Sequence, residues 1–293
     1  MKKYFFQNHP LLNHFLPSHP PNKTPFIPMR KFWTCQLFAA CLLLFSCREK
    51  TEAPLVPCLL KNIQDVAGTF ERDYQYDAAN RLVRVSDSED GQVIESWDLE
   101  YDSNGRWIKL TQEDGYSAFE YDPAGKVVSI QEYRLIGSTY RVLGSSTLEY
   151  NARHQVTKRT YFPVNTTAPG DYFRYEYNAA GNVTKEFYRR AGPNSPERLW
   201  QEFTAYDNKN SLYATPVLRL YTLLIRDASA YSLNNPLSIN YYKDDGTLSG
   251  SDTFVFEYNS RNYPIHLRYS STWLGQEPES ETYRLAYNCG EVN

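Results

Sequence analysis

Apolar and polar residues alternate along most of the chain beyond residue 70, with the two-residue period of a half-buried β-strand. The alternation is clearest before six Tyr-Asp or Tyr-Asn pairs, where an apolar residue stands two positions ahead of the tyrosine and Glu or Gln lies between them. The six tyrosines are Tyr76, Tyr101, Tyr121, Tyr150, Tyr177 and Tyr258. Each segment therefore predicts a strand with one buried face and one solvated, largely acidic face.

A turn signal follows each of these tyrosines. The Asp or Asn closes a turn through a hydrogen bond from its side chain to the backbone, and Gly or Asn three residues later accepts the left-handed conformation. His154 occupies that position in one copy and predicts a distorted turn. The basic residues Arg81, Arg106 and Lys126 then begin the next strand, where we expect them opposite the acid of the turn. The pattern predicts a series of β-hairpins.

The hairpin pattern is a repeat, with steps of 25, 20, 29 and 27 residues between successive tyrosines from Tyr76 to Tyr177. Tyr206-Asp207 and Tyr287-Asn288 extend the series, although Tyr206-Asp207 lacks the usual continuation. The repeat resembles the YD repeat of RHS and teneurin proteins. Over roughly residues 60–293 the chain is similar to the tyrosine-rich YD-repeat lipoproteins of unknown function of Bacteroidota. The resemblance implies an antiparallel β meander and no particular activity.

The predicted fold is all-β. We expect residues 61–293 to form an antiparallel meander of roughly 14–18 strands, as an elongated twisted sheet or one curled upon itself. Residues 212–233 do not fit the repeat, and Pro216 opens an apolar run that suits one short helix near 216–226. A buried strand is the alternative for that run, because short apolar runs are ambiguous.

The N-terminal part differs in composition from the rest of the chain and predicts a targeting segment. Residues 1–28 are rich in Pro and His, and we expect no packed structure there. Met29 begins a basic start and an apolar run that together resemble a secretory signal peptide over 29–46, so residues 1–28 are interpreted as an upstream extension before the true start. An unusually long basic region of the signal is the alternative.

Leu44-Phe45-Ser46-Cys47 resembles the lipobox of bacterial lipoproteins. The resemblance implies cleavage before Cys47, lipid attachment to that cysteine, and a tether over 47–60. An ordinary signal peptide with an incidental cysteine is the alternative. Arg48 stands where some bacteria place an Asp that retains lipoproteins in the inner membrane, which favours an outer-membrane lipoprotein, facing the periplasm or the cell surface.

Cys58 and Cys289 lie near the two ends of the mature chain. In an oxidising envelope such a pair forms a disulfide or remains two unrelated buried thiols, and the sequence leaves both open.

Composition narrows the function classes. The chain has 31 Lys+Arg and 34 Asp+Glu, a net charge of -3, which excludes a strongly basic nucleic-acid binder. Its 25 tyrosines and 15% aromatic residues argue against a disordered chain and for strands.

Catalytic and metal-binding motifs are missing from the sequence. There is no zinc-binding, hydrolase-elbow or phosphate-loop pattern, so we predict no catalytic residues, no metal and no cofactor. His154 and His266 lie far apart within repeat units and are interpreted as structural. Most acids occupy repeated positions, as on a solvated face, whereas a catalytic pair would be unique.

Two tryptophans outside the repeated positions, Trp97 and Trp273, are the candidate binding aromatics for sugar rings or extended peptides. Packing within the sheet is the alternative role for both. The sequence favours a non-enzymatic, lipid-anchored envelope protein that binds glycan or protein at the outer membrane. The alternatives are a structural or assembly subunit of an envelope complex and a carboxylate-based glycan-cleaving enzyme. The three hypotheses predict different surfaces. A glycan binder should have an exposed aromatic patch, an assembly subunit a broad apolar patch or an open sheet edge, and an enzyme two converging carboxylates.

Overall fold

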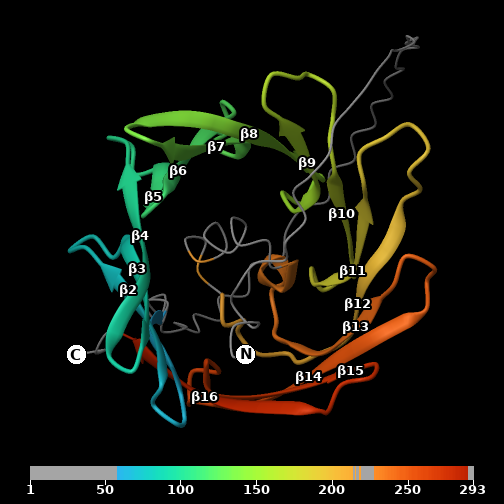
Figure 1. Cartoon of the computed structure of the whole chain (residues 1–293). Helices are drawn as coiled ribbons and strands as arrows, with labels where there is room; N and C mark the ends of the chain where they lie inside the picture. The colour runs from blue at the N-terminus through green and yellow to red at the C-terminus, as the bar shows by residue number, and fades with distance from the viewer. Residues whose placement is uncertain (1–57, 214, 216–217, 219–227, 290–293) are drawn as a thin grey trace, which may run out of the picture.

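Sixteen antiparallel strands close into a barrel in the computed structural model, which describes residues 58–213, 215, 218 and 228–289 (Figure 1). The strands are β1 (Leu59–Asp65), β2 (Phe70–Tyr76), β3 (Leu82–Glu89), β4 (Gln92–Tyr101), β5 (Trp107–Gln112), β6 (Gly115–Tyr121), β7 (Val127–Ile136), β8 (Thr139–Tyr150), β9 (Val156–Pro163), β10 (Tyr172–Tyr177), β11 (Val183–Arg189), β12 (Arg198–Tyr206), β13 (Pro236–Tyr242), β14 (Leu248–Tyr258), β15 (Pro264–Trp273) and β16 (Glu279–Asn288). A short 3₁₀ helix, η1 (Ala228–Tyr231), precedes β13.

The barrel closes where the first strand meets the last. Each strand pairs with its neighbour in sequence, and β1 also pairs with β16, with Ile63 opposite Leu285. The all-β antiparallel meander is confirmed, but the expected elongated or curled sheet is wrong. The accumulated twist and coil of sixteen strands brings β16 to β1, and pairing them removes both open edges.

The apolar face of the strands points into the barrel. Tyr175 in β10 contacts Tyr231 of η1, with ring centroids 5.0 Å apart, and η1 (orange) lies inside the ring of strands in Figure 1. Positions related to Tyr175 by strand alternation and cross-strand pairing, such as Leu99 and Phe119, are buried in one continuous core. The intervening Glu residues therefore face outward, as the alternation predicted.

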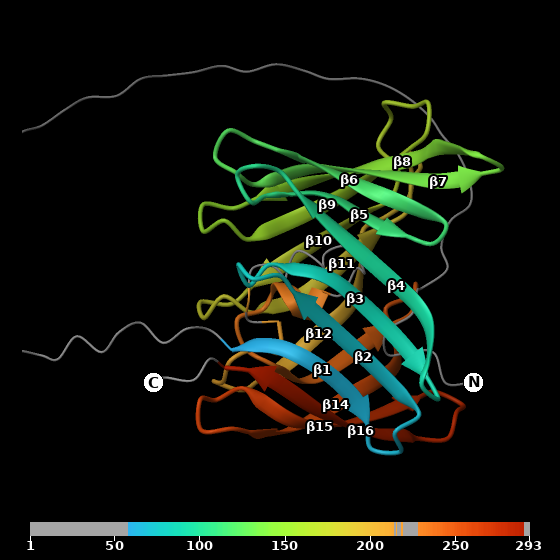
Figure 2. The ribbon, with the colours of Figure 1, turned by 90° about the vertical axis from the view of Figure 1, so that its left-hand side faces the viewer.

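All the Tyr-Asp and Tyr-Asn turns lie at one end of the barrel, here called the YD end. Figure 2 shows the tilted strands running between this end, on the left, and the end formed by the other hairpin turns, on the right. The second set joins β1 to β2, β3 to β4 and so on to β15 and β16, and we call it the rim.

The recurring tyrosines link one hairpin to the next at the YD end. In five of them the hydroxyl donates a hydrogen bond to a backbone carbonyl near the start of the preceding strand, where regular pairing stops. These bonds are Tyr76 to Leu60, Tyr101 to Leu82, Tyr150 to Val127, Tyr177 to Val156 and Tyr206 to Val183, at 2.6–2.8 Å. Burial raises the pKa of Tyr150 to about 12, so the hydroxyl remains a donor at neutral pH.

The turns themselves are built as the sequence predicted. Asp77 accepts hydrogen bonds from the backbone N–H groups of Ala79 and Arg81, and its other oxygen pairs with the Arg81 guanidinium at 2.6 Å. The guanidinium also lies 4.8 Å from the ring centroid of Tyr101 in the next hairpin. Arg81 and Arg106 thus each contact both the acid of their own turn and the tyrosine of the next hairpin.

The distortion expected at His154 is absent from the structure. His154 has φ of 63°, close to the 59° of Asn80, and its N–H donates to the Asn151 carbonyl at 3.0 Å. The Asn151 side chain still accepts from the backbone of Arg153 and Gln155. The prediction was wrong because histidine can occupy the left-handed conformation, at an energetic cost, when the surrounding turn enforces it.

The irregular Tyr206-Asp207 copy begins a long connection that enters the barrel. Leu212, Tyr213 and Leu218 belong to the same buried core as the strands. Asn235 holds both ends of the connection, because its side chain accepts from the Leu212 N–H and donates to Asp207, at 2.8 and 3.0 Å. The copy lacks a normal turn because the chain leaves the wall at this point.

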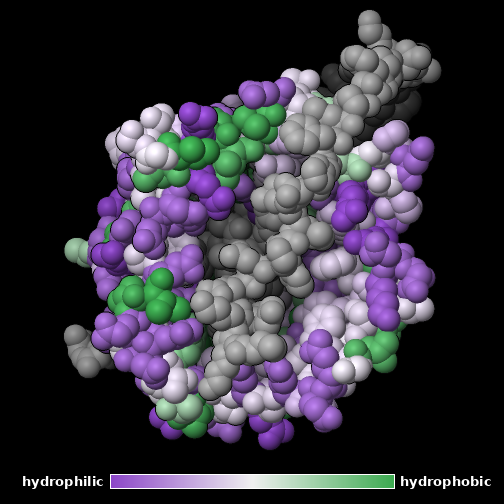
Figure 3. Space-filling view, viewed as in Figure 1, coloured by the Kyte–Doolittle hydropathy of each residue, from purple (hydrophilic) through white to green (hydrophobic). Residues whose placement is uncertain are grey.

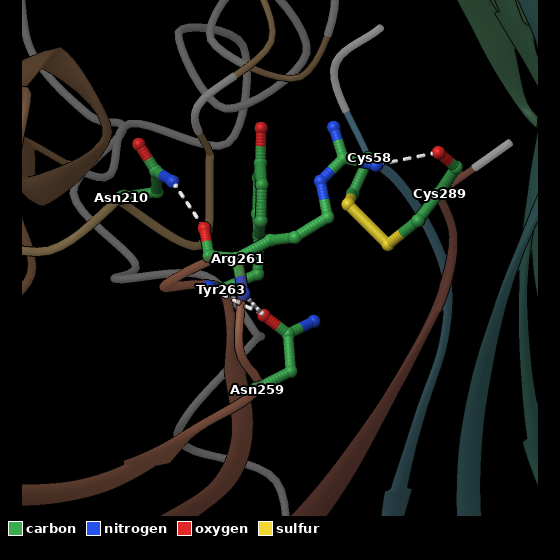
Figure 4. Close-up of a disulfide and its surroundings, with 6 residues drawn as sticks. All are labelled: Cys58, Asn210, Asn259, Arg261, Tyr263 and Cys289. Carbon is green, nitrogen blue, oxygen red and sulfur yellow. Dashed lines mark hydrogen bonds between the residues drawn. A yellow bond between two sulfur atoms is a disulfide. The ribbon is translucent and has the colours of Figure 1, made fainter. Parts of the chain in front are cut away.

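A disulfide joins Cys58 at the start of β1 to Cys289 after β16 (Figure 4). The Cys289 carbonyl also accepts a hydrogen bond from the Arg261 guanidinium at 2.6 Å. Arg261 lies in the turn between β14 and β15, and its carbonyl accepts from the Asn210 side chain of the inner connection at 3.1 Å. The closing seam, a YD turn and the inner connection thus meet at one place.

Several sequence predictions lie outside the described residues. These are the extension 1–28, the signal peptide 29–46, lipidation at Cys47, most of the tether 47–60, and the helix near 216–226 except for Leu218. Among the described residues, no helix has the length and apolar character needed to cross a bilayer.

Candidate functional site on the outer wall

An aromatic cluster lies on the outer face of the wall, where β6, β7 and β8 approach the rim. Phe119 points into the core, so Tyr116, three residues earlier in the same regular strand, points outward. Tyr116 pairs directly with Tyr133 of β7, and Leu135, two residues beyond Tyr133, pairs with Tyr140 of β8. Alternation therefore places all three tyrosines on the outer face.

The three rings form a contiguous group that we call the tyrosine triad: Tyr116, Tyr133 and Tyr140. Tyr116 and Tyr133 stack with ring centroids 4.3 Å apart and planes 14° apart. Tyr140 meets Tyr116 edge to face at 5.0 Å. Tyr140 is 46% exposed and Tyr133 is partly exposed, so the group offers aromatic surface to solvent.

Polar groups surround the triad. The Lys109 ammonium lies 5.0 Å from the centroid of the Tyr116 ring. The Tyr133 hydroxyl donates to the Gln131 side chain, and desolvation by burial raises the pKa of Tyr133, which keeps the hydroxyl protonated. Arg134 and Asp114 form an exposed ion pair at 3.2 Å nearby. Aromatic surface beside donors and acceptors suits a ligand with apolar faces and polar edges, such as a sugar ring.

The predicted binding tryptophans lie elsewhere, on the inner face. Trp97 in β4 is 7% exposed, and the Arg72 guanidinium lies 5.6 Å from its ring. Trp273 in β15 is half-buried and stacks on Tyr241 with centroids 4.9 Å apart. Gly250 permits this stacking, because a Cβ there would lie 2.7 Å from the indole. Strands β16, β1, β2 and β3 separate the two tryptophans, so they form no common platform.

Carboxylates on the inner wall each have a partner. Asp87 binds the Arg72 guanidinium through both oxygens at 2.6 Å, in a buried ion pair. Three hydroxyl groups donate to Asp252, and desolvation raises its pKa. These partnerships are Arg72 with Asp87, Arg159 with Glu132, Gln201 with Glu186, and Tyr241, Tyr269 and Ser271 with Asp252. In the described part of the chain, no group of His, Cys, Asp and Glu is arranged to hold a metal ion.

The sequence carried a signal for the triad that the repeat obscured. Tyr116 and Tyr133 fall on the polar positions of their strands, opposite in alternation to Phe119 and Ile130. An aromatic residue at such a position is a candidate for solvent exposure. The stacking of Tyr116 on Tyr133 depends on the register between β6 and β7, which no local pattern specifies.

The barrel of YD-type hairpins has known relatives. Residues 61–191 match the family model described as Teneurin YD-shell. This segment is therefore similar to a YD-repeat family, and the resemblance predicted from the tyrosine pairs is confirmed.

One solved structure shares the fold at low sequence identity, and others match with lower similarity. A porin-like protein from Bacteroides uniformis is 11% identical, with a TM-score of 0.55, and the match covers 80% of this chain and 99% of that one. A porin-like protein from Bacteroides vulgatus is 12% identical over 78% and 99% of the two chains, with a TM-score of 0.48. The Photorhabdus luminescens Tc holotoxin pore is 14% identical over 73% and 13%, with a TM-score of 0.28. No protein of curated function matches the sequence.

Proposed function

We propose that the chain is a non-enzymatic binding protein of the cell envelope, tethered by lipid at Cys47, and that it binds glycan through the tyrosine triad. The observation that carries the proposal is the solvent-accessible group of contacting rings, Tyr116, Tyr133 and Tyr140, on the outer wall. An exposed aromatic cluster on an otherwise polar surface is a typical recognition feature.

The charged outer wall supports a barrel that faces water. Cross-strand ion pairs lie on the outer face near the YD end, including Lys109 with Glu100 at 2.9 Å and Lys158 with Glu149 at 3.3 Å. A lipid-facing wall would need apolar side chains at such positions. The description porin-like, printed for the Bacteroides uniformis protein, implies a barrel wall that faces lipid. We propose instead that the wall of this barrel faces water and that the lipid at Cys47 attaches it to the membrane.

The enzymatic alternative has less support. A glycan-cleaving site needs two carboxylates aimed at one bond, with one of them free to donate a proton. Asp87 is held by Arg72 in a buried pair, and Asp252 accepts from three hydroxyl groups. Such engaged carboxylates favour a structural role for the inner polar groups.

Thermal unfolding of the purified full-length chain with soluble glucan, xylan, mannan and chitin oligosaccharides tests the proposal. A ligand present at about a hundred times its Kd should raise Tm by roughly 5–10 °C. Tyr140→Ala and Tyr133→Ala should abolish the shift, whereas Val255→Ala, which truncates an exposed outer-face residue away from the triad, should retain it.

Two outcomes would contradict the proposed site. A shift that survives both tyrosine variants but disappears in Trp273→Ala would move the binding site to the inner wall. No shift with any oligosaccharide would remove glycan binding as the function.

A further inference from the structure

The exposed large apolar side chains are concentrated at the rim. Nine of the twelve such residues among those described lie on the rim turns or in the strand residues beside them. They are Val66, Val93, Ile94, Leu135, Ile136, Tyr140, Val164, Leu248 and Leu274. Figure 3 looks onto this end, and its apolar (green) surface occurs as separate patches around the edge of the barrel.

Five neighbouring rim turns, together with the strand residues beside them, combine these apolar residues with acids. Around the barrel they are the turns β13–β14, β15–β16, β1–β2, β3–β4 and β5–β6, and we call them the acidic arc. Their exposed apolar residues are Leu248, Leu274, Val66, Val93 and Ile94. Their exposed acids are Glu89, Asp90, Glu113, Asp114, Asp244, Asp245, Glu277 and Glu279.

The arc carries a strong excess of negative charge. Lys243 is the basic residue on these five turns. Arg134 and Arg198, from the neighbouring strands β7 and β12, pair with Asp114 and Asp244 and leave the other acids of the arc around the apolar groups. Because of this negative charge, a partner that covers the exposed leucines and valines should carry positive charge.

We propose that the acidic arc is a docking surface for a polypeptide that presents basic and apolar side chains together. Burial of Leu274, 72% exposed, and Val93, 66% exposed, would supply apolar contact, and the surrounding acids would attract Lys and Arg of the partner. An anionic bilayer would be repelled by the same acids, and a second copy would bring like charges together.

The arc lies at the end of the barrel opposite the closing disulfide. Cys58 lies at the YD end, so the chain enters the barrel at the end opposite the arc. No member of the tyrosine triad lies on these five turns. Asp114 belongs to the arc and also forms an ion pair beside the triad, so the variants below leave the triad and Asp114 unchanged. The arc residues are exposed, so their side chains can be changed without altering the core.

The test uses the full-length chain and a fluorescent amphipathic peptide of leucine and lysine, with a matched leucine and glutamate peptide as control. The lysine peptide should bind, and raising the salt from 50 to 300 mM should weaken binding about tenfold. The double variant V93S/L274S should weaken binding about tenfold as well, and E277Q/E279Q should weaken it and reduce its salt dependence. Val255→Ser, which changes a residue 55% exposed on the outer wall, should bind as the unmodified chain does.

Any of four results would overturn the proposal. These are equal binding of both peptides, unchanged binding by V93S/L274S, binding of phosphatidylglycerol vesicles that V93S/L274S abolishes, and self-association in sedimentation that the same variant abolishes. Thermal unfolding of each variant shows that the barrel is intact when binding is measured.

Discussion

At the scale of single residues, the repeated tyrosine performs a task that no other side chain type could share. Its ring packs against the core, and its hydroxyl reaches the carbonyl of the preceding strand, as Tyr150 reaches Val127 at 2.7 Å. Phenylalanine would keep the packing and lose the bond, whereas a shorter polar residue would lose both. The recurrence of tyrosine, and not of any aromatic residue, follows from this hydrogen bond at the point where strand pairing ends.

Tyr150→Phe should lower the free energy of unfolding by about 1–1.5 kcal/mol, because the Val127 carbonyl loses a donor in a partly buried position. The Lys126 ammonium, 5.5 Å from the ring centroid, keeps its aromatic contact in the variant. Urea denaturation followed by fluorescence measures the change. Tyr140→Phe is the matched control, since Tyr140 is exposed, and it should change stability by less than about 0.5 kcal/mol. Equal effects of the two substitutions would show that the hydrogen bond contributes nothing specific.

At the scale of the element, each hairpin is specified by a few residues around its turn. Asp77 orders the turn backbone, Asn80 accepts a positive φ of 59°, and Arg81 holds Asp77. These interactions are local, so the sequence alone predicted the hairpins and their order. Local information was also enough to predict which face is buried, because the alternation between Leu99 and Glu100 is a property of one strand.

The turn at His154 gives a prediction with a definite sign. His154 is held at φ of 63°, where a side chain costs conformational energy that glycine does not. His154→Gly should therefore raise the free energy of unfolding by about 0.5–1 kcal/mol, while Gly125→Ala, at φ of 81° with open space around the added methyl group, should lower it by a similar amount. Chemical denaturation of both variants measures the pair. Two changes of the same sign would contradict the interpretation that the turns share one backbone requirement.

At the scale of the whole molecule, local patterns are insufficient. Closure depends on the pairing of β1 with β16, two strands separated by almost the full described chain. No sequence motif in either strand predicts that it pairs with the other. The cluster of Tyr116, Tyr133 and Tyr140 also depends on registers between strands, and the acidic arc depends on the order of turns around a closed ring. The sequence therefore predicted the repeated unit, whereas the closed shape and the surfaces created by closure required the structure.

The seam between β1 and β16 is where the barrel depends on a covalent bond. The disulfide joins residues 231 apart in sequence, and a crosslink that closes so long a loop restricts the unfolded chain strongly. The double variant C58S/C289S should lose about 2–5 kcal/mol of stability, a fall in Tm of roughly 5–15 °C. The unmodified chain in a strong reductant should melt at the same lowered temperature, and the variant should not respond to the reductant. Because the pairs between β1 and β16 from Leu60 to Asp65 do not involve the cysteines, we expect far-UV circular dichroism to show an intact barrel before melting. Equal melting of the variant and the oxidised chain would mean that strand pairing alone holds the seam, and loss of the folded spectrum at room temperature would mean that the barrel cannot close without the disulfide.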